Sequence, residues 1–167
     1  MNASLHTVAI GGLSRSALKS KLRDRGIQLN DFANQLVLHP VFNNVQAPIV
    51  KHFAIRRLAD LGLNDGASLS EVFSAAQRHH LSLCPVTAGP YLRLAYTNQP
   101  MSKHSVLNVG KAPNSSLTVA SVALGDDEFP KGFYLRTVDD QQWLRGYRCT
   151  DEHLFSADDH FIFLAAS

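Results

Sequence analysis

The fold is decided by residues 133–147, which read FYLRTVDDQQWLRGY. Apolar and polar side chains alternate on both sides of Asp139-Asp140, as they do in two antiparallel strands joined by a two-residue turn. A turn of that length fixes three cross-strand pairs: Val138 with Gln141, Arg136 with Trp143, and Tyr134 with Arg145. We therefore expect a β-hairpin whose leucines share one face and whose arginines share the other.

Other short apolar segments follow in the C-terminal half of the chain. Clusters of Gly, Pro, Asn and Asp separate them, and the predicted strands cover residues 91–96, 117–124, 133–138, 142–148 and 161–165. Alternation and spacing predict an antiparallel sheet. Residues 98–116 are polar and are predicted to form a loop long enough to be functional.

The N-terminal half carries the signals of helices. Ser14 and Asn30 are good N-cap residues in front of two helical patterns. Ser68 and Glu71 have the spacing of a capping box at the start of a third helix. Residues 49–61 fit both a strand and a helix, and their first part favours a strand.

The length of 167 residues predicts one domain covering residues 1–167. We expect an α+β fold in which a mainly helical portion, residues 1–83, packs on one face of an antiparallel sheet formed mainly by residues 84–167. The composition is 45% hydrophobic and 18% charged, which is too apolar for a disordered chain.

Charge excludes one broad class of protein. The net charge is +2, so bulk charge does not indicate a polybasic nucleic-acid-binding protein. Basic residues do gather on the polar side of the first predicted helix, at Lys19, Lys21, Arg23 and Arg25, with Asp24 among them.

The N-terminal residues 1–7 contain no Lys or Arg, and no apolar run approaches the 18 residues of a membrane span. We therefore expect a soluble, cytoplasmic protein that does not enter a membrane. Cys84 and Cys149 have no C-x-x-C partner, which favours two free thiols. No metal site and no cofactor are predicted.

Three triplets of an aromatic residue, leucine and arginine recur in the predicted strands, at residues 91–93, 134–136 and 143–145. Period-two alternation directs one set of side chains into the core, namely Leu92, Leu94, Phe133, Leu135 and Leu144. The opposite face supplies the candidate ligand-binding residues Tyr91, Arg93, Tyr134, Arg136, Trp143, Arg145 and Tyr147.

Two interpretations of this second face remain open. In the first, the arginines and aromatic rings form cross-strand pairs that only stabilise the sheet. In the second, the rings stack against flat groups and the guanidinium groups bind phosphate or carboxylate.

The sequence motifs for catalysis are weaker than those for ligand binding. His153 and the stretch Asp158-Asp159-His160 supply possible ligands, but their spacing is not that of a zinc motif. Gly110-Lys111 lacks the first glycine and the following Ser or Thr of a phosphate-binding loop, and the chain has no Gly-x-Ser-x-Gly elbow. The catalytic alternative is a small enzyme that uses this His and Asp cluster with an arginine as anion clamp.

The segments FPKGFYLR (residues 129–136) and WLRGY (residues 143–147) resemble those of a group of small uncharacterised bacterial proteins, some loosely labelled helicase-like. The resemblance extends over most of the chain and implies a small-protein family without a stated activity. Because the phosphate-loop pattern fails, an ATP-driven helicase is not expected. The group carries Asp-Gly where this chain has Asp139-Asp140, and Asp accepts a positive φ less readily than Gly.

These observations predict a non-catalytic binding module that presents an Arg and aromatic sheet face to an acidic partner, either a protein or a single-stranded nucleic acid. The small enzyme is the alternative. A flat, open sheet face favours the module. A cleft that brings His153, Asp158 and His160 beside Arg136 or Arg145 favours the enzyme.

Overall fold

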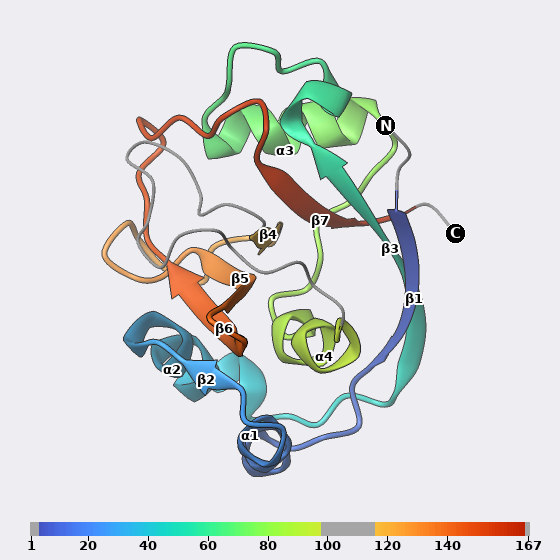
Figure 1. The fold of residues 1–167 in the computed structure, drawn as a ribbon, viewed down its shortest axis with the longest axis vertical. Helices are drawn as coiled ribbons and strands as arrows, with labels where there is room; N and C mark the ends of the chain where they lie inside the picture. The colour runs from blue at the N-terminus through green and yellow to red at the C-terminus, as the bar shows by residue number, and fades with distance from the viewer. Residues whose placement is uncertain (1–3, 98–115, 166–167) are drawn as a thin grey trace.

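The structure is a computed structural model that describes residues 4–97 and 116–165, with side chains described from residue 7 onward. In this part of the chain, seven strands form one sheet in the order β1-β3-β7-β4-β5-β6-β2. The strands are β1 (Ser4–Ile10), β2 (Gln28–Leu29), β3 (Ile49–Arg57), β4 (Leu117–Val119), β5 (Gly132–Val138), β6 (Gln141–Tyr147) and β7 (His160–Leu164). Figure 1 shows the sheet curling around helix α4 (Ala88–Ala95).

The fold is α+β, as predicted, but the sheet is mixed. β2 pairs in parallel with β6, and β4 pairs in parallel with β7, while the other pairs are antiparallel. Residues 84–167 supply four of these seven strands, and the N-terminal half supplies β1, β2 and β3. The prediction of an antiparallel sheet is therefore wrong for these two parallel pairs, which local alternation does not reveal because each joins segments distant in sequence.

The hairpin of β5 and β6 has the predicted register. Arg136 lies opposite Trp143, and Tyr134 lies opposite Arg145. Asp139 and Asp140 form the turn with φ values of 51° and 63°, the positive values that a two-residue turn between twisted strands needs.

The other helices begin at the predicted caps. They are α1 (Arg15–Asp24), α2 (Asp31–Leu38) and α3 (Leu69–Arg78), with short 3-10 turns η1 (Pro40–Phe42) and η2 (Leu58–Leu61). The side chains of Ser14 and Asn30 accept hydrogen bonds from the third residue of α1 and α2. Ser68 and Glu71 form the capping box of α3, in which Glu71 Oε1 accepts from Ser68 N at 2.9 Å.

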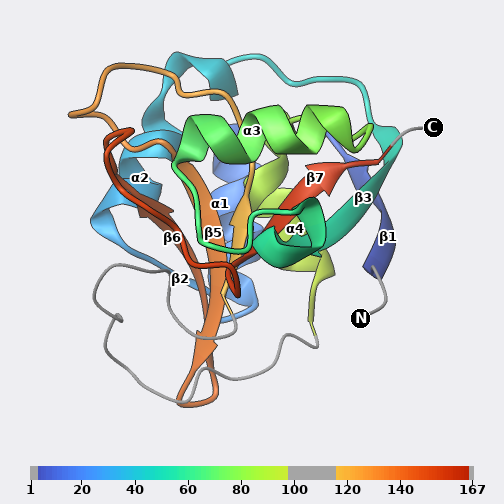
Figure 2. The same ribbon diagram turned by 90° about the horizontal axis from the view of Figure 1, so that it is seen from above.

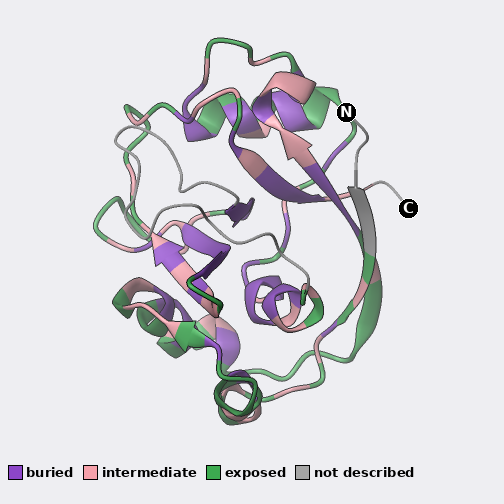
Figure 3. Ribbon diagram, viewed as in Figure 1, coloured by how far each residue is buried: buried purple, intermediate pink, exposed green. Residues whose placement is uncertain are grey.

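Two apolar cores lie on opposite faces of the sheet. Phe53 of β3 and Ile162 of β7 belong to the larger core, with residues of α1, α2 and α4. The neighbouring residues Ala54, Phe161 and Phe163 belong to the smaller core, with α3. Helices therefore lie on both faces rather than on one. Figure 2 shows α3 lying across β7 and β3, and Figure 3 shows buried residues on both sides of these strands.

Residues 91–96, which the sequence predicts as a strand, lie almost entirely in helix α4. Pro90 fits in the first turn of this helix, where a backbone N–H has no helical acceptor. Gly89 lets the helix lie directly on the ring of Phe133, which a Cβ at that position would overlap. The apolar residues of this short segment fit both periodicities, and packing on β5 selects the helix.

Several other predictions concern single features. Cys84 and Cys149 are free thiols. No helix in the described part of the chain is long and apolar enough to cross a membrane. The predicted loop at residues 98–116 lies outside the described residues except for Ser116, and so does Gly110-Lys111.

Candidate functional site

The predicted Arg and aromatic face exists on β5 and β6, but it is not an open platform. Phe133, Leu135 and Leu144 point into the larger core, so the facial assignment of the hairpin is confirmed. On the other face, Tyr134 is only 7% exposed and Arg136 is 0% exposed. The expectation that the arginines of this face stay out of the interior is therefore wrong for Arg136.

Aromatic packing covers much of this face. Tyr134 meets Tyr147 edge to face, with ring centroids 6.4 Å apart, and Tyr147 meets Phe155 in the same way. Phe155 continues to Phe161 at 5.2 Å, within the smaller core. Because burial raises the pKa of Tyr147, its hydroxyl stays protonated at neutral pH. These rings are core residues rather than a surface for stacking a ligand.

Arg93 is also buried, so the expectation that these arginines stay out of the interior is wrong for this residue too. It projects from α4 and is 0% exposed, and its guanidinium donates to the carbonyls of Arg136 and Trp143 at 3.3 and 3.2 Å. A third bond reaches the carbonyl of Tyr96 at 2.6 Å. Burial lowers the pKa of Arg93 to about 10, so the group remains a cation at neutral pH. Arg93 thus holds α4 against the β5–β6 hairpin.

On this face of the hairpin, Trp143, Arg145 and Tyr147 are half-buried rather than buried. The guanidinium carbon of Arg145 lies 4.3 Å from the centroid of the Trp143 ring, a cation–π contact. Burial first, and then the Arg145 charge, lower the pKa of Arg136. Both residues belong to β6, so this contact runs along one strand and is not one of the cross-strand pairs of the first interpretation.

The C-terminal His and Asp residues do not converge on a cleft. His153 packs against the ring of Phe155, with centroids 4.7 Å apart, and the Asp159 carboxylate accepts a hydrogen bond from Ser156 N. Asp158 lies 3.8 Å from Arg57 rather than beside Arg136 or Arg145. Among the described residues, no three His, Cys, Asp or Glu side chains are placed to hold a metal ion.

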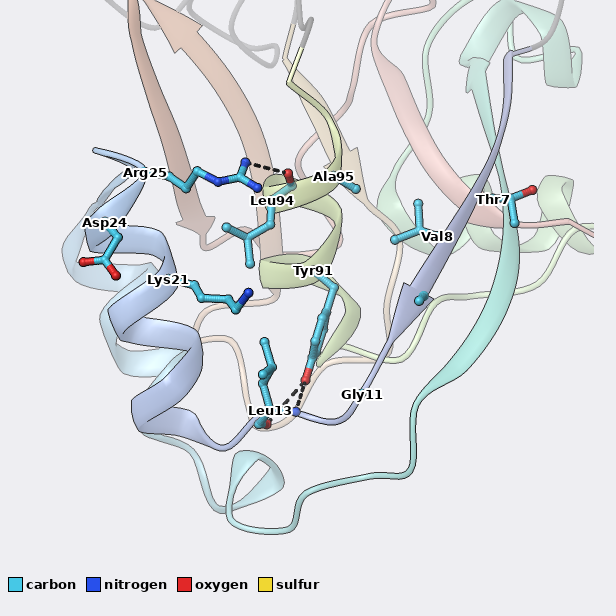
Figure 4. A pocket seen from close by; sticks show the side chains of 11 residues that line it. Thr7, Val8, Gly11, Leu13, Lys21, Asp24, Arg25, Tyr91, Leu94 and Ala95 are labelled. Atoms are coloured by element: carbon cyan, nitrogen blue, oxygen red, sulfur yellow. Dashed lines mark hydrogen bonds between the residues drawn. The ribbon is translucent and has the colours of Figure 1, made fainter.

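Tyr91 belongs to a different site, which the sequence does not predict. In the described part of the chain, β1 and β2 are the two edge strands of the sheet, and α1 lies between them (Figure 1). A hollow of about 660 Å³ remains between β1, α1 and α4. Figure 4 shows Tyr91 rising through it, and its hydroxyl binds the backbone N–H and C=O of Leu13.

Two basic side chains reach this hollow, Lys21 from α1 and Arg25 from the residue that caps its C-terminus. Lys21 and Arg25 are exposed, and within the described residues neither forms an ion pair with a carboxylate. Arg25 donates to the carbonyl of Leu94 at 3.3 Å, near the C-terminus of α4. Asp24 also lines the hollow, which leaves an excess of one positive charge.

A second hollow of about 580 Å³ adjoins the first and shares Gly11, Leu13 and Tyr91 with it. Its lining is more apolar and includes Ile10, Leu18, Val41, Phe42, Pro48 and Ile49. The two hollows together offer a cationic part and an apolar part within the size range of ligand sites.

The sequence contains one signal for this site, the basic side of the first helix. Alternation and capping locate Lys21 and Arg25 on that helix, but they do not show that β1 and α4 lie opposite. Comparisons with protein-family models, curated proteins and solved structures find no match for this chain. The resemblance to the small bacterial group therefore stays a prediction.

Proposed function

We propose that this protein is a non-catalytic binding module for an acidic protein partner, and that the hollow between β1, α1 and α4 is its binding site. The observation that carries the proposal is the pair Lys21 and Arg25, which reach this hollow with no carboxylate partner among the described residues. Cations without carboxylate partners favour an anionic ligand and speed its encounter with the site.

The chemistry of the partner follows from the two hollows. A carboxylate suits Lys21 and Arg25, and an apolar side chain suits the adjoining hollow around Phe42 and Pro48. A protein segment offers both groups, whereas a single-stranded nucleic acid needs exposed rings for stacking. Tyr134 is buried, Tyr147 is half-buried against Phe155, and Arg145 lies over the half-buried Trp143 ring. None of the rings of the hairpin is fully exposed, so a protein partner is favoured over a nucleic acid.

The basic side chains near the end of α1 also have a simpler explanation, and an experiment must distinguish it from ligand binding. Lys21, Arg23 and Arg25 lie near the C-terminus of α1, where cations favour the helix dipole without any ligand. Lys19 and Arg23 are exposed on the same helix but do not line the hollow. They provide a matched control.

Fluorescence anisotropy with a labelled polyglutamate peptide tests the proposal, with polylysine and polythymidylate as further probes. The double variant Lys21→Glu/Arg25→Glu is expected to bind polyglutamate about tenfold more weakly, while Lys19→Glu/Arg23→Glu retains most of the affinity. Equal losses in both variants would show that only the net charge matters. If only Trp143→Ala and Arg145→Lys lose affinity for the peptide, the binding site is the sheet face and not the hollow.

A further inference from the structure

β1 is an edge strand, and one hydrogen bond shows which of its backbone groups are unpaired. The carbonyl of His52 in β3 accepts from Ala165 N at 2.9 Å, so the backbone groups of His52 point toward β7. In antiparallel strands, the N–H and C=O of one residue point to the same side. His52 therefore makes no ladder bond with Thr7, the residue opposite it in β1.

The side chains agree with this parity. Thr7 Oγ1 lies 3.1 Å from His52 Nδ1, and side chains approach closely in pairs without ladder bonds. The N–H and C=O of Thr7 thus point away from β3. By the period of two, the same holds for Leu5 and Ala9.

These outward groups border the first hollow. Thr7 and Ala9 line it and are exposed, and among the described residues no other element makes a backbone hydrogen bond to either. β1 reads SLHTVAI, so it lacks the lysine, proline or acidic residues that protect many edge strands. The edge can therefore pair with one more strand.

The charge of the hollow distinguishes between two possible strands. Lys21 and Arg25 belong to the lining opposite β1, so a strand with acidic side chains is attracted. If two copies of this chain paired through β1 about a two-fold axis, both sets of basic side chains would flank the same junction and repel. The charge of the hollow thus favours a segment of another protein over a second copy of this chain.

We propose that an extended acidic segment of the partner adds to the sheet at β1, with its backbone hydrogen-bonded to Thr7 and Ala9 and its carboxylates beside Lys21 and Arg25. This inference rests on the proposed function, because it assumes that the hollow binds an acidic protein. It adds the conformation of the partner and the backbone groups that recognise it.

Amide hydrogen exchange, measured by NMR, tests directly which amides of β1 point away from β3. The probe is a short peptide of alternating valine and glutamate, and a peptide of alternating valine and lysine is the control. In the free protein, the amides of Thr7 and Ala9 are expected to exchange much faster than those of His6 and Val8. The glutamate peptide is expected to slow the exchange of the Thr7 and Ala9 amides at least about tenfold, whereas the lysine peptide is expected to leave it unchanged. Unchanged exchange at Thr7 and Ala9 under saturating peptide would overturn strand addition.

The variant Ala9→Pro removes one outward N–H without removing a ladder bond to β3, since proline is tolerated at that side of an edge strand. We expect an unchanged melting temperature and at least about tenfold weaker binding of the glutamate peptide. The control Lys19→Glu/Arg23→Glu lies outside the hollow and is expected to keep most of the affinity for the glutamate peptide. If Ala9→Pro does not fold, the exchange measurement on the unmodified chain decides alone.

The two proposals fail in different ways. If Lys21→Glu/Arg25→Glu abolishes binding but Ala9→Pro has no effect, the hollow binds an acidic partner without strand addition. If neither variant has an effect, both proposals are wrong. If the chain alone forms a dimer that Ala9→Pro dissociates in light scattering, β1 pairs with a second copy and the foreign-segment proposal is overturned.

Discussion

Leu135 is a single residue on which the assignment of the hairpin faces can be tested. It is 0% exposed in the larger core, so Leu135→Ala is expected to lower the free energy of unfolding by about 2–5 kcal/mol. Urea denaturation measures this loss. Leu154→Ala is the control, because Leu154 is 57% exposed and its truncation should change stability by at most about 0.5 kcal/mol. Similar small losses in both variants would show that Leu135 is not a core residue.

His160 is a residue whose titration affects stability. Burial first, and then the Arg57 cation opposite it in β3, lower its pKa below the ordinary value of 6.5. A hydrogen bond with the backbone of Asp158, and the charges of Asp60 and Asp159, act in the opposite direction but do not reverse the shift. The unfolded chain therefore binds the proton more readily, and stability is lost as the pH falls below about 6.5. In urea melts between pH 7 and 5, His160→Gln should lose less stability than the unmodified chain. Parallel pH profiles would contradict this.

At this scale, the sequence shows on which face of a strand a side chain lies, but it does not show whether other residues bury that face. Alternation correctly places Leu135 and Arg136 on opposite faces of β5. It does not show that Arg136 is buried, because the aromatic packing on that face includes Phe155, which is distant in sequence. Arg93 shares its triplet pattern with Arg145, yet one binds backbone carbonyls in the interior and the other lies on Trp143.

At the scale of elements, the turn between β5 and β6 offers a stabilising substitution. Asp140 has a φ of 63°, which costs an ordinary L residue about 1–2 kcal/mol and costs glycine nothing. Asp140→Gly is expected to raise the free energy of unfolding by about 0.5–1 kcal/mol, after the entropy that glycine loses on folding. Asp140→Ala removes the same carboxylate without relieving the backbone and should destabilise. A gain in both variants would attribute the effect to charge instead.

Elements with local signals could be predicted, and those set by distant packing could not. Ser68 and Glu71 are three residues apart, and their capping box begins α3 as the spacing indicates. The two-residue turn likewise fixes the hairpin register within its own sequence. Helix α4 is decided by contact with Phe133, more than forty residues away, which no local pattern contains.

At the scale of the whole molecule, β7 connects the two parts of the sheet. It lies between β3, from the N-terminal half, and β4, from the C-terminal half. A chain ending at residue 158 lacks β7 and is expected to lose cooperative unfolding and the dispersion of its NMR spectrum. Phe161, Ile162 and Phe163 also leave both cores in this truncation. A truncated chain that still melts cooperatively would show that the two parts fold independently.

The candidate hollow is also a property of the whole molecule. Its lining joins residues 7–13, 21–25 and 91–95, which come together only when the curled sheet and α1 are in place. Sequence patterns identify the basic side of α1, and the fold determines what that side faces. The site could therefore be predicted in its charge but not in its location.

The central position of β7 also has a consequence for biosynthesis. The ribosome makes residues 160–164 after every other strand of this sheet, so β3 and β4 leave the exit tunnel before the strand that separates them. Until β7 emerges, both present unpaired edges to other nascent chains on the polysome. The sheet is thus expected to be completed only after β7 is translated. In that interval, the unpaired strands β3 and β4 are expected to bind chaperones that recognise extended apolar segments.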